Sequence, residues 1–273
     1  MTMPMPTLSE TDLDLREAVL AGLAAEASRM ALGYFKRQDA LGVSMKGTQD
    51  WLTVADGAVE DLLRSRLNTL FPTDAVIGEE GGGEAGAVVW IIDPIDGTAN
   101  FARGDRVWCI SIGLLVDNEP VLGIIAAPAL DEIYAARKGR GATRDGEPIK
   151  VSGGTDIGRA CIELGWSSRL PNELYVAMVG RAYAAGASVK RCGSGALGLA
   201  RVACGVTDAY AEKHINAWDV AAGFVIAREA GAALNDFFAG DGIGSGNPIL
   251  CCTPGLTRQF EEVTEIVSQR DNG

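Results

Sequence analysis

The sequence predicts a fold of mixed α and β type, and three observations lead to this prediction. Apolar residues recur at helical spacing in two segments within the first 70 residues. A run of strand-like apolar segments begins at Val88. After residue 153, short strands and helices alternate. We therefore expect one compact unit with two subdomains, an α+β subdomain over residues 1–152 and a smaller α/β subdomain over residues 153–273.

The elements of the first subdomain follow from periodicity and from turn residues. Leucines and alanines place one apolar face on each of the two helices, and Ser9 or Thr11 could cap the first helix while Asp50 could cap the second. Asp117 to Pro120 forms a turn between two apolar runs. The expected order is helix 8–37, helix 50–68, strand 71–77, a glycine-rich loop 80–86, strand 88–92, a hairpin of strands 107–116 and 121–128, and strand 133–136.

The second subdomain is expected to alternate strands with helices. Gly231 is suited to end the last of these helices, because glycine readily adopts the left-handed conformation found there. The expected order is strand 160–164, helix 172–185, strand 187–191, helix 197–204, strand 209–211, helix 218–230 and strand 232–234.

The segment W-I-I-D-P-I-D-G-T-A-N-F, residues 90–101, carries the clearest chemical signal. An apolar strand leads directly into Asp93 and Asp96, and Pro94 is expected to stop the strand because it donates no ladder hydrogen bond. Gly97 and Thr98 then turn the chain and leave backbone N–H groups accessible. Carboxylates beside free N–H groups can hold hard cations and an anionic oxygen together. This pattern indicates metal-assisted phosphate transfer.

Two further acidic segments could join this site. Glu79 and Glu80 lie in I-G-E-E, and Asp219 lies in A-W-D-V-A-A-G at the start of a helical pattern. Mg²⁺ prefers oxygen ligands in an octahedron and keeps several waters, so a few carboxylates suffice to bind it. Two such ions, roughly 3.5–4 Å apart, can stabilise both the attacking and the leaving oxygen of an in-line displacement.

These motifs resemble those of the inositol monophosphatase family, Mg²⁺-dependent and lithium-sensitive phosphatases of sugars and polyols. The resemblance is carried by G-E-E, D-P-I-D-G-T and W-D-V-A-A-G, at residues 78–80, 93–98 and 218–223, in this order and at similar spacing. It extends from the first helix to about Phe260. It implies the layered α-β-α-β-α sandwich of the inositol monophosphatase and fructose-1,6-bisphosphatase type, two to three Mg²⁺ ions per site, and a homodimer.

The resemblance also implies roles for the motif residues. Asp93 would bridge two metal ions, Asp96 and Asp219 would bind the second, and Glu79 with the Ile95 carbonyl would complete the first. The implied catalytic set is Glu79, which orients the attacking water, Thr98, whose hydroxyl can accept the proton of that water, and Asp56. Gly97 and Thr98 would bind the phosphate through their N–H groups. Lys46, Thr53 and Asp56 match the family segment near a third, weaker metal position.

Specificity contacts are implied in the second subdomain. Gly193, Ser194 and Gly195 match a turn whose backbone touches the polyol, together with Asp96, and Glu212 matches an acidic residue that holds substrate hydroxyls. Two positions depart from the family pattern: Asn216 stands where many relatives have histidine, and Trp166 enlarges the L-G-W-S-S-R loop. Both departures concern substrate identity and leave the phosphatase chemistry unchanged.

One motif is rejected. G-S-G-A-L-G, residues 193–198, is a literal G-x-G-x-x-G, and Glu212 follows at roughly the distance seen in dinucleotide-binding sites. However, it does not open the first β-α-β unit of the chain, and it lies inside the phosphatase pattern. We therefore do not expect a nucleotide cofactor.

The composition of the chain restricts the classes of partner and of metal site that remain. The net charge of −12 argues against nucleic acid or an anionic membrane as a partner. The six cysteines show no C-x-x-C spacing, so neither a zinc site nor a thioredoxin-like site is indicated, and buried thiols in a reducing compartment are expected. A single histidine excludes a histidine-rich zinc site. With no signal peptide and no apolar run of transmembrane length, the cytoplasm is the expected location.

Together these features predict a Mg²⁺-dependent phosphomonoesterase that uses a metal-activated water. The first-choice substrate is inositol 1-phosphate or a similar small polyol phosphate, and histidinol phosphate, which bacterial members of the family use, is the alternative. Fructose 1,6-bisphosphate and phosphoadenosine phosphate are disfavoured. An alternative of another class is a regulatory or binding protein on a phosphatase scaffold.

Overall fold

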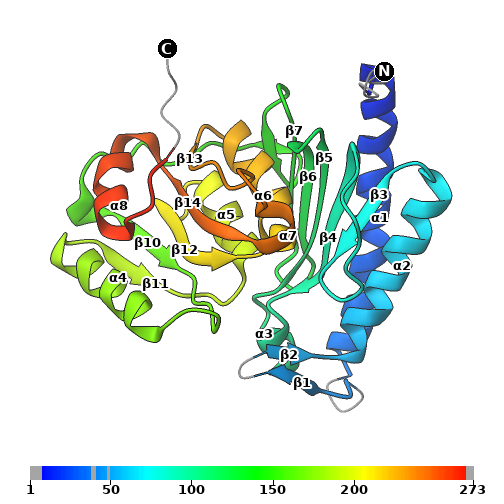
Figure 1. The fold of residues 1–273 in the computed structure, drawn as a ribbon, viewed down its shortest axis with the longest axis horizontal. Coiled ribbons are helices and arrows are strands. Elements are labelled where there is room, and N and C mark those ends of the chain that lie inside the picture. Colours follow the sequence, from blue (N-terminus) through cyan, green and yellow to red (C-terminus); the bar gives the residue numbers. More distant parts are fainter. Residues whose placement is uncertain (1–7, 38–40, 48–49, 269–273) are drawn as a thin grey trace.

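The computed structural model describes residues 8–37, 41–47 and 50–268, and they form five layers (Figure 1). Helices α1 (Glu10–Phe35) and α2 (Val54–Leu70) cover the outer face of a large sheet. Helices α5 (Gly195–Ala203) and α6 (Ala217–Glu229) lie between this sheet and a smaller one. Helices α4 (Asn172–Ala184) and α8 (Thr257–Thr264) cover the far side of the smaller sheet. The predicted α-β-α-β-α sandwich is confirmed.

The large sheet has seven strands in the order β3-β4-β5-β6-β7-β8-β9. The first pair is parallel and every other pair is antiparallel. Its strands are β3 (Ala75–Gly78), β4 (Val88–Asp96), β5 (Cys109–Val116), β6 (Glu119–Ala127), β7 (Glu132–Arg137), β8 (Ala142–Arg144) and β9 (Glu147–Pro148), and the short helix α3 (Thr98–Ala102) follows β4.

The small sheet has five strands in the order β11-β10-β12-β14-β13. Strand β10 pairs in parallel with both neighbours, whereas β14 is antiparallel to both of its own. Its strands are β10 (Cys161–Leu164), β11 (Ser188–Lys190), β12 (Ala209–Ile215), β13 (Ala233–Leu234) and β14 (Asn247–Cys252); the other short elements are η2 (Ile157–Arg159), α7 (Gly242–Ser245) and η3 (Pro254–Leu256). The expected boundary between residues 152 and 153 falls between the two sheets and stays a prediction.

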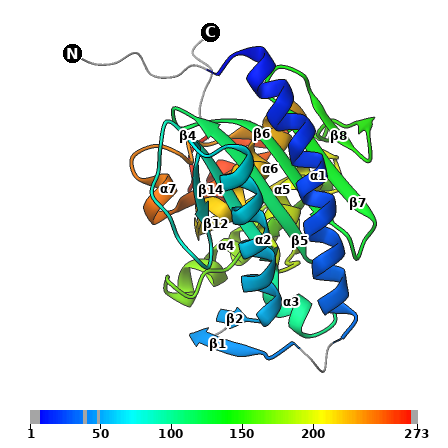
Figure 2. The same ribbon diagram turned by 90° about the vertical axis from the view of Figure 1, so that its right-hand side faces the viewer.

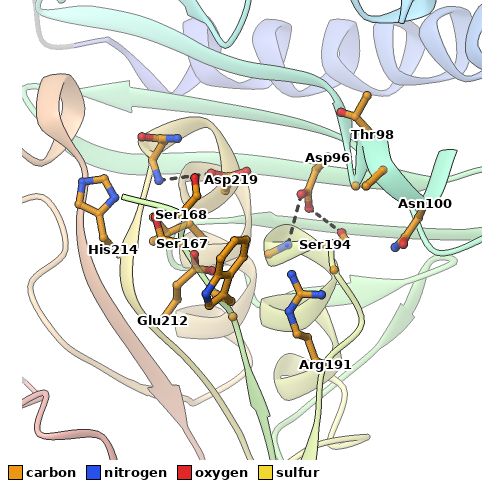
Figure 3. Close-up of a pocket in the computed structure, with 18 of the residues that line it drawn as sticks. Asp96, Thr98, Asn100, Ser167, Ser168, Arg191, Ser194, Glu212, His214 and Asp219 are labelled. Carbon is orange, nitrogen blue, oxygen red and sulfur yellow. Dashed lines mark hydrogen bonds between the residues drawn. The ribbon is translucent and has the colours of Figure 1, made fainter. Parts of the chain in front are cut away.

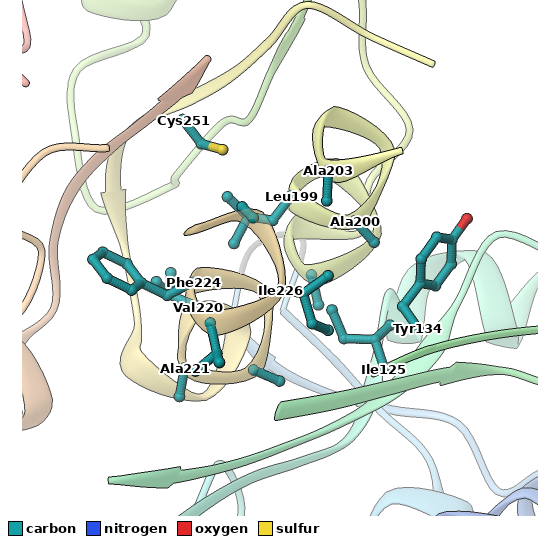
Figure 4. Packing of buried hydrophobic residues seen from close by; sticks show 14 of the residues in the cluster. Ile125, Tyr134, Leu199, Ala200, Ala203, Val220, Ala221, Phe224, Ile226 and Cys251 are labelled. Atoms are coloured by element: carbon teal, nitrogen blue, oxygen red, sulfur yellow. The ribbon is translucent and has the colours of Figure 1, made fainter. Parts of the chain in front are cut away.

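The large sheet is apolar on both faces because helices cover both. In β4, Trp90 and Ile92 pack against α1 and α2, while Val89 and Ile91 pack toward α5 and α6. Figure 4 shows part of the cluster of apolar side chains between the large sheet and helices α5 and α6, including Leu199 of α5 and Phe224 of α6. Because successive side chains along a strand point to opposite faces, this one sheet contributes to two hydrophobic cores.

Helix α6 approaches the large sheet at two glycines. A Cβ atom at Gly113 of β5 would lie 2.8 Å from the Ala221 side chain, and one at Gly123 of β6 would lie 2.5 Å from the Ala222 carbonyl oxygen. The helix backbone therefore rests directly on the sheet, and the position of α6 is set by backbone contact.

The structure corrects three local expectations. Helix α2 begins at Val54 and is capped by Thr53, not by Asp50, because Thr53 and Asp56 form a reciprocal capping box. Asp50 instead begins β2 (Asp50–Leu52), which forms a hairpin with β1 (Ser44–Gly47). Strand β3 starts four residues later than expected, at Ala75.

The third correction concerns Pro94, which does not stop strand β4. The strand continues to Asp96, and its register with β5 shifts between Asp93, opposite Ser111, and Asp96, opposite Cys109. This irregularity accommodates a residue that cannot donate a ladder hydrogen bond. Within the described ranges, no helix is both long enough and apolar enough to cross a bilayer.

Candidate active site and metal centre

The end of β4 places two carboxylates inside the molecule. Asp93 is 1% exposed and Asp96 is 6% exposed. The register shift between them turns the intervening chain, so that the Ile95 N–H donates to Asp93 Oδ1 at 2.9 Å. A bulge next to a functional site commonly directs side chains in this way.

Asp219 completes a group of three carboxylates. It occupies the third position of α6, where its carboxylate accepts a hydrogen bond from the Asn216 N–H at 3.2 Å. One oxygen from each of Asp93, Asp96 and Asp219 lies within 4.8 Å of the other two. An all-oxygen set of this size suits a hard cation such as Mg²⁺.

The electrostatics of this group also fit a cation. Burial raises the pKa of Asp93, Asp96 and Asp219, and neighbouring carboxylates raise the pKa of Asp93 and Asp219 further. Burial likewise raises the pKa of Glu79 to about 8. Several buried carboxylates in one place cannot all ionise without a compensating positive charge. The site therefore fits a bound metal ion.

Glu79 reaches the site because β3 and β4 run in parallel and end together, with Gly78 opposite Ile92. Lys46 of the β1–β2 hairpin lies near both glutamates, with Nζ 3.6 Å from Glu79 and 2.7 Å from Glu80. Glu80 thus pairs with the lysine, and Glu79 is left facing the cavity.

Glu60 of α2 supports the loop that contains Glu79 and Glu80, and the sequence pattern did not indicate this residue. Its buried carboxylate accepts hydrogen bonds from the N–H groups of Glu80, at 2.8 Å, and Gly81, at 2.7 Å. A Cβ atom at Gly78 would lie 2.6 Å from this carboxylate. The glycine of the G-E-E motif is therefore required by the close packing of Glu60.

Thr98, which follows the end of β4, contacts Asp56 of α2. Its hydroxyl lies 3.1 Å from Asp56 Oδ1 and 3.0 Å from the Ile95 carbonyl oxygen. The other oxygen of Asp56 accepts from the N–H of Thr53 at 2.8 Å and from its hydroxyl at 2.6 Å. Because burial raises the pKa of Asp56, this carboxyl group can take up a proton more readily than an exposed aspartate.

A cavity of about 300 Å³ opens above these groups (Figure 3). Its lining includes two of the three clustered aspartates, Asp96 and Asp219, and also Glu79. All seven residues predicted to contact the substrate line it, namely Asp96, Gly97, Thr98, Gly193, Ser194, Gly195 and Glu212. Asp93, Ile95, Lys46, Thr53 and Asp56 lie outside the lining.

The turn before α5 contacts Asp96 directly. Asp96 accepts hydrogen bonds from the Ser194 hydroxyl at 2.5 Å and from the N–H groups of Gly195, at 3.2 Å, and Ala196, at 2.7 Å. The start of α5 is therefore occupied by a protein carboxylate. A Cβ atom at Gly198 would lie 2.3 Å from the Tyr210 ring, so this glycine serves packing. Both findings agree with the rejection of a dinucleotide site.

Asn100 of α3 also contacts this turn, and the sequence pattern did not indicate that it would. Its side-chain amide donates to the Val107 carbonyl at 2.7 Å and to the Cys192 carbonyl at 2.8 Å. The residue thus joins α3, which follows β4, to the turn that carries Ser194. Its position in T-A-N-F was the available signal, but a polar residue in a short helix does not by itself indicate a partner distant in the sequence.

The wall of the cavity that β12 and the loop around Trp166 form is polar. Glu212 accepts a hydrogen bond from the Tyr210 hydroxyl at 2.8 Å, and burial raises its pKa to about 7. Trp166 lies in the same lining, with its indole N–H donated to Asn172 at 2.8 Å and the Arg191 guanidinium 6.0 Å from its ring centroid. The sequence pattern did not single out Arg191 or His214, which also lines the cavity.

Comparisons with known proteins agree with this arrangement. The model of the inositol monophosphatase family matches residues 12–269. The chain is 35% identical over 268 residues to the inositol-1-monophosphatase SuhB of Mycobacterium tuberculosis, covering 89% of this chain and 91% of that protein. It is 33% identical over 226 residues to the Nus factor SuhB of Xylella fastidiosa, covering 82% of each. The crystal structure of the extragenic suppressor protein suhB from Bartonella henselae superposes with a TM-score of 0.85 at 28% identity, covering 91% of this chain and 97% of that one.

Proposed function

The chain belongs to the inositol monophosphatase family and is a phosphatase, and on this basis we propose that it is a Mg²⁺-dependent phosphomonoesterase acting on a small polyol phosphate. The observation that carries the proposal is the gathering of Asp93, Asp96 and Asp219 within 4.8 Å of one another beside a polar cavity. An acidic site in a chain of net charge −12 would repel a phosphate ester unless cations were bound there.

The proposed metal ligands are the residues whose oxygens converge at the end of β4. Glu79, Asp93 and the Ile95 carbonyl would hold one ion, and Asp93, Asp96 and Asp219 would hold a second. Mg²⁺ bound there would polarise the phosphoryl oxygens and lower the pKa of water. Lys46, Thr53 and Asp56 remain the proposed region of a third, weaker ion, although Lys46 now pairs with Glu79 and Glu80.

The protein groups have separate proposed roles in the reaction. Glu79 orients the attacking water, since it faces the cavity at the metal end. Thr98 accepts the proton of that water while its own hydroxyl hydrogen moves toward Asp56, 3.1 Å away. As the water oxygen bonds to phosphorus, the ester P–O bond breaks, and the leaving alkoxide takes a proton from solvent water. The N–H groups of Gly97 and Thr98 bind the phosphate oxygens. General-base assistance of this kind contributes roughly 10²–10⁴-fold to a rate.

We propose inositol 1-phosphate as the first substrate to test, with histidinol phosphate as the alternative. The support for inositol 1-phosphate is the name of the M. tuberculosis relative and the polar residues Gly193, Ser194, Gly195 and Glu212, which line the cavity together with Asp96. The test is phosphate release with Mg²⁺ from inositol 1-phosphate, histidinol phosphate, fructose 1,6-bisphosphate and phosphoadenosine phosphate. We expect the highest kcat/KM for inositol 1-phosphate. A clear preference for another ester would reassign the substrate.

The same assay tests whether the reaction depends on a metal ion. Chelation should abolish phosphate release and Mg²⁺ should restore it, and lithium should inhibit because a small monovalent ion can occupy the second site. Full activity in the presence of a chelator would contradict a metal-dependent mechanism. Sedimentation of the purified protein tests the proposed homodimer. No partnership with nucleic acid or membrane is proposed, and the cytoplasm remains the proposed location.

A regulatory or binding role is the second candidate, because the X. fastidiosa relative carries the name Nus factor. The two roles can be separated with Asp219→Asn. If the biological role is catalytic, this variant should fail to complement a deletion strain. Complementation by a variant without phosphatase activity would favour the binding role.

A further inference from the structure

The two oxygens of the Asp96 carboxylate are held differently by the first turn of α5. Oδ2 accepts hydrogen bonds from the Ser194 hydroxyl at 2.5 Å and from the Ala196 N–H at 2.7 Å, whereas Oδ1 accepts only the Gly195 N–H, at 3.2 Å (Figure 3). A carboxylate offers about two lone-pair sites on each oxygen. The contacts therefore fill the sites on Oδ2 and leave one site on Oδ1 for another partner.

The hydroxyl group of Ser194 is committed to this contact. An ionised carboxylate can only accept, so the single hydroxyl hydrogen of Ser194 is donated to Asp96. The Ser194 oxygen also accepts the Leu197 N–H at 3.3 Å, as the N-cap of α5. Ser194 is 3% exposed. Although it lines the cavity, its side chain thus has no second hydrogen to donate to a substrate.

Cys109 packs against the same oxygen of Asp96. It stands opposite Asp96 in the register of β4 with β5 and is fully buried. Its Sγ atom lies 3.7 Å from Asp96 Oδ2 and 3.7 Å from Ser194 Oγ. A thiol is only a weak donor, so it adds little to the two hydrogen bonds already made there. Oδ2 is thus surrounded by protein groups, and Oδ1 is the oxygen left with a lone pair for a cation.

The number of oxygens that a carboxylate can offer affects which cation it suits. Mg²⁺ demands a near-ideal octahedron and keeps several waters, whereas Ca²⁺ takes more oxygen ligands and accepts carboxylates through one oxygen or two. A carboxylate fixed to offer a single oxygen therefore suits Mg²⁺. One that is free to turn and offer both oxygens suits Ca²⁺ better.

We propose that Ser194 is a positioning residue that makes Asp96 a one-oxygen metal ligand and thereby favours Mg²⁺ over Ca²⁺ at the candidate metal centre. The inference rests on the proposed function, because it concerns the ion of that site. It gives the Ser194 side chain a role apart from the predicted substrate contact of its turn, since the hydroxyl acts on the reaction only through Asp96.

Two substitutions remove the hydroxyl but differ in their effect on the helix. Ser194→Ala also removes a good N-cap residue, whereas Ser194→Gly retains one, because glycine caps a helix almost as well as serine. We expect both variants to bind Mg²⁺ about tenfold more weakly, as when a hydrogen bond to a metal-binding carboxylate is lost, and Ca²⁺ within about threefold of wild type. Calorimetric titration of the substrate-free protein with each cation measures these affinities.

The matched control is Ser9→Ala, because Ser9 caps α1 and its hydroxyl donates to the Asp12 carboxylate at 2.7 Å. Like Ser194→Ala, it should lower the melting temperature, but both cation affinities should stay unchanged. The inference would be overturned if Mg²⁺ affinity fell only in Ser194→Ala, or if both variants lost as much affinity for Ca²⁺ as for Mg²⁺.

The same titrations distinguish this inference from the proposed function. If the wild type bound Mg²⁺ but hydrolysed none of the esters, the proposed function would fail, and the comparison of the Ser194 variants would still decide the role of the hydroxyl. If the wild type hydrolysed an ester and all variants bound both cations alike, the proposed function would stand and the role of Ser194 would be rejected. Absence of Mg²⁺ binding to the wild type would reject both.

Discussion

Asp219 combines two roles in one side chain. Its carboxylate caps the first turn of α6 by accepting the Asn216 N–H, and it lies among the other carboxylates of the candidate metal centre. Asparagine could still accept the cap hydrogen bond through its amide oxygen, but it would remove the charge that a cation needs. The two roles can therefore be separated by a single substitution.

We expect Asp219→Asn to lower phosphate release more than about 100-fold, because a metal ligand is lost. The metal-free variant should melt at the wild-type temperature or above it, since burial and neighbouring charges raise the pKa of Asp219 and a crowded negative charge is removed. Phosphate release and thermal unfolding measure the two effects. Asp131→Asn, at an exposed residue with positive φ, is the control and should keep full activity. Wild-type turnover of Asp219→Asn would reject the proposed metal site.

Thr98 allows a test of the proposed proton acceptor. Thr98→Val keeps the shape of the side chain but removes the hydroxyl that contacts Asp56, so kcat should fall about 10²-fold or more. Thr98→Ser keeps the hydroxyl and should remain within about tenfold of wild type. Steady-state kinetics at saturating Mg²⁺ measure both. Equal kcat values for the two variants would show that the hydroxyl has no part in the reaction.

At this scale the sequence predicted nine of the 26 residues that line the cavity, including every predicted substrate contact. Glu79, Asp96 and Asp219 could be found because they stand at the ends of β3 and β4 and at the start of α6, where sequence patterns are readable. Glu60, Asn100 and Arg191 could not be found in this way, because their partners lie in other segments and ordinary helix or loop positions give no sign of them. The roles of the predicted residues stay predictions until they are tested.

Helix α6 is the element that brings Asp219 to β4. It can do so because Gly113 and Gly123 leave room for its backbone on the sheet. The expected helix 218–230 agrees closely with the observed Ala217–Glu229, and Gly231 ends it with φ of 89°. The glycines under it were not singled out, because a glycine in a strand pattern does not indicate which element lies above it.

Gly123→Ala should therefore disturb both stability and metal binding. The new methyl group would lie 2.5 Å from the Ala222 carbonyl oxygen, so α6 must move, and we expect a loss of about 1–3 kcal/mol in the free energy of unfolding. The affinity for Mg²⁺ should fall as Asp219 moves with the helix. Urea unfolding and Mg²⁺ titration measure the two effects.

The matched control is Gly180→Ala in α4, where a Cβ atom would meet nothing within 4 Å. This substitution should stabilise the protein or leave it unchanged, because alanine favours a helix more than glycine does. If Gly123→Ala behaved like the control, backbone contact would not be what positions α6.

The start of α2 shows why element boundaries are harder to predict than elements. The sequence T-V-A-D, residues 53–56, is a capping box, yet the expected helix began at Asp50 because the preceding residues do not interrupt the apolar pattern. Because the expected helix included the residues of β2, the β1–β2 hairpin was not predicted. The segments 247–252 and 257–264, which form β14 and α8, were not assigned either, although P-I-L-C-C was recognised as apolar.

In the whole molecule, a group of buried carboxylates lies where metal ions are expected. Glu79 has a pKa of about 8 in the metal-free protein, compared with 4.5 for an ordinary glutamate, because burial disfavours its ionised form. A carboxyl group with a raised pKa stabilises the fold when it is protonated, so its contribution is present below about pH 4.5 and is lost as the pH rises toward 8. The metal-free protein should therefore lose stability over this range.

Mg²⁺ should reverse this loss, because it binds the ionised carboxylates of the folded state. We expect the increase in melting temperature produced by Mg²⁺ to be larger at pH 8.5 than at pH 5.5. Thermal unfolding with Mg²⁺ or with a chelator at both pH values measures it, and Asp219→Asn should show a smaller increase. An equal increase at both pH values would mean that these carboxylates do not bind the ion.

The layered order of the whole molecule could not be obtained from periodicity, which indicates only that helices and strands are both present. It came from the resemblance of three short motifs to a family, and the structure confirmed it. The separation into two sheets depends on long-range pairing, such as β12 beside both β10 and β14, that no local pattern specifies.

The seating of α6 on bare backbone has a consequence for how such a protein could diversify. Because the backbone of α6 contacts the sheet directly at Gly113 and Gly123, mutations that exchange one apolar residue for another elsewhere in the core need not displace Asp219. The wall formed by β12 and the Trp166 loop lies on the other sheet and can vary independently. New substrates could thus be acquired by changing that wall while the hydrolytic chemistry is inherited intact, and laboratory evolution of specificity would best begin there.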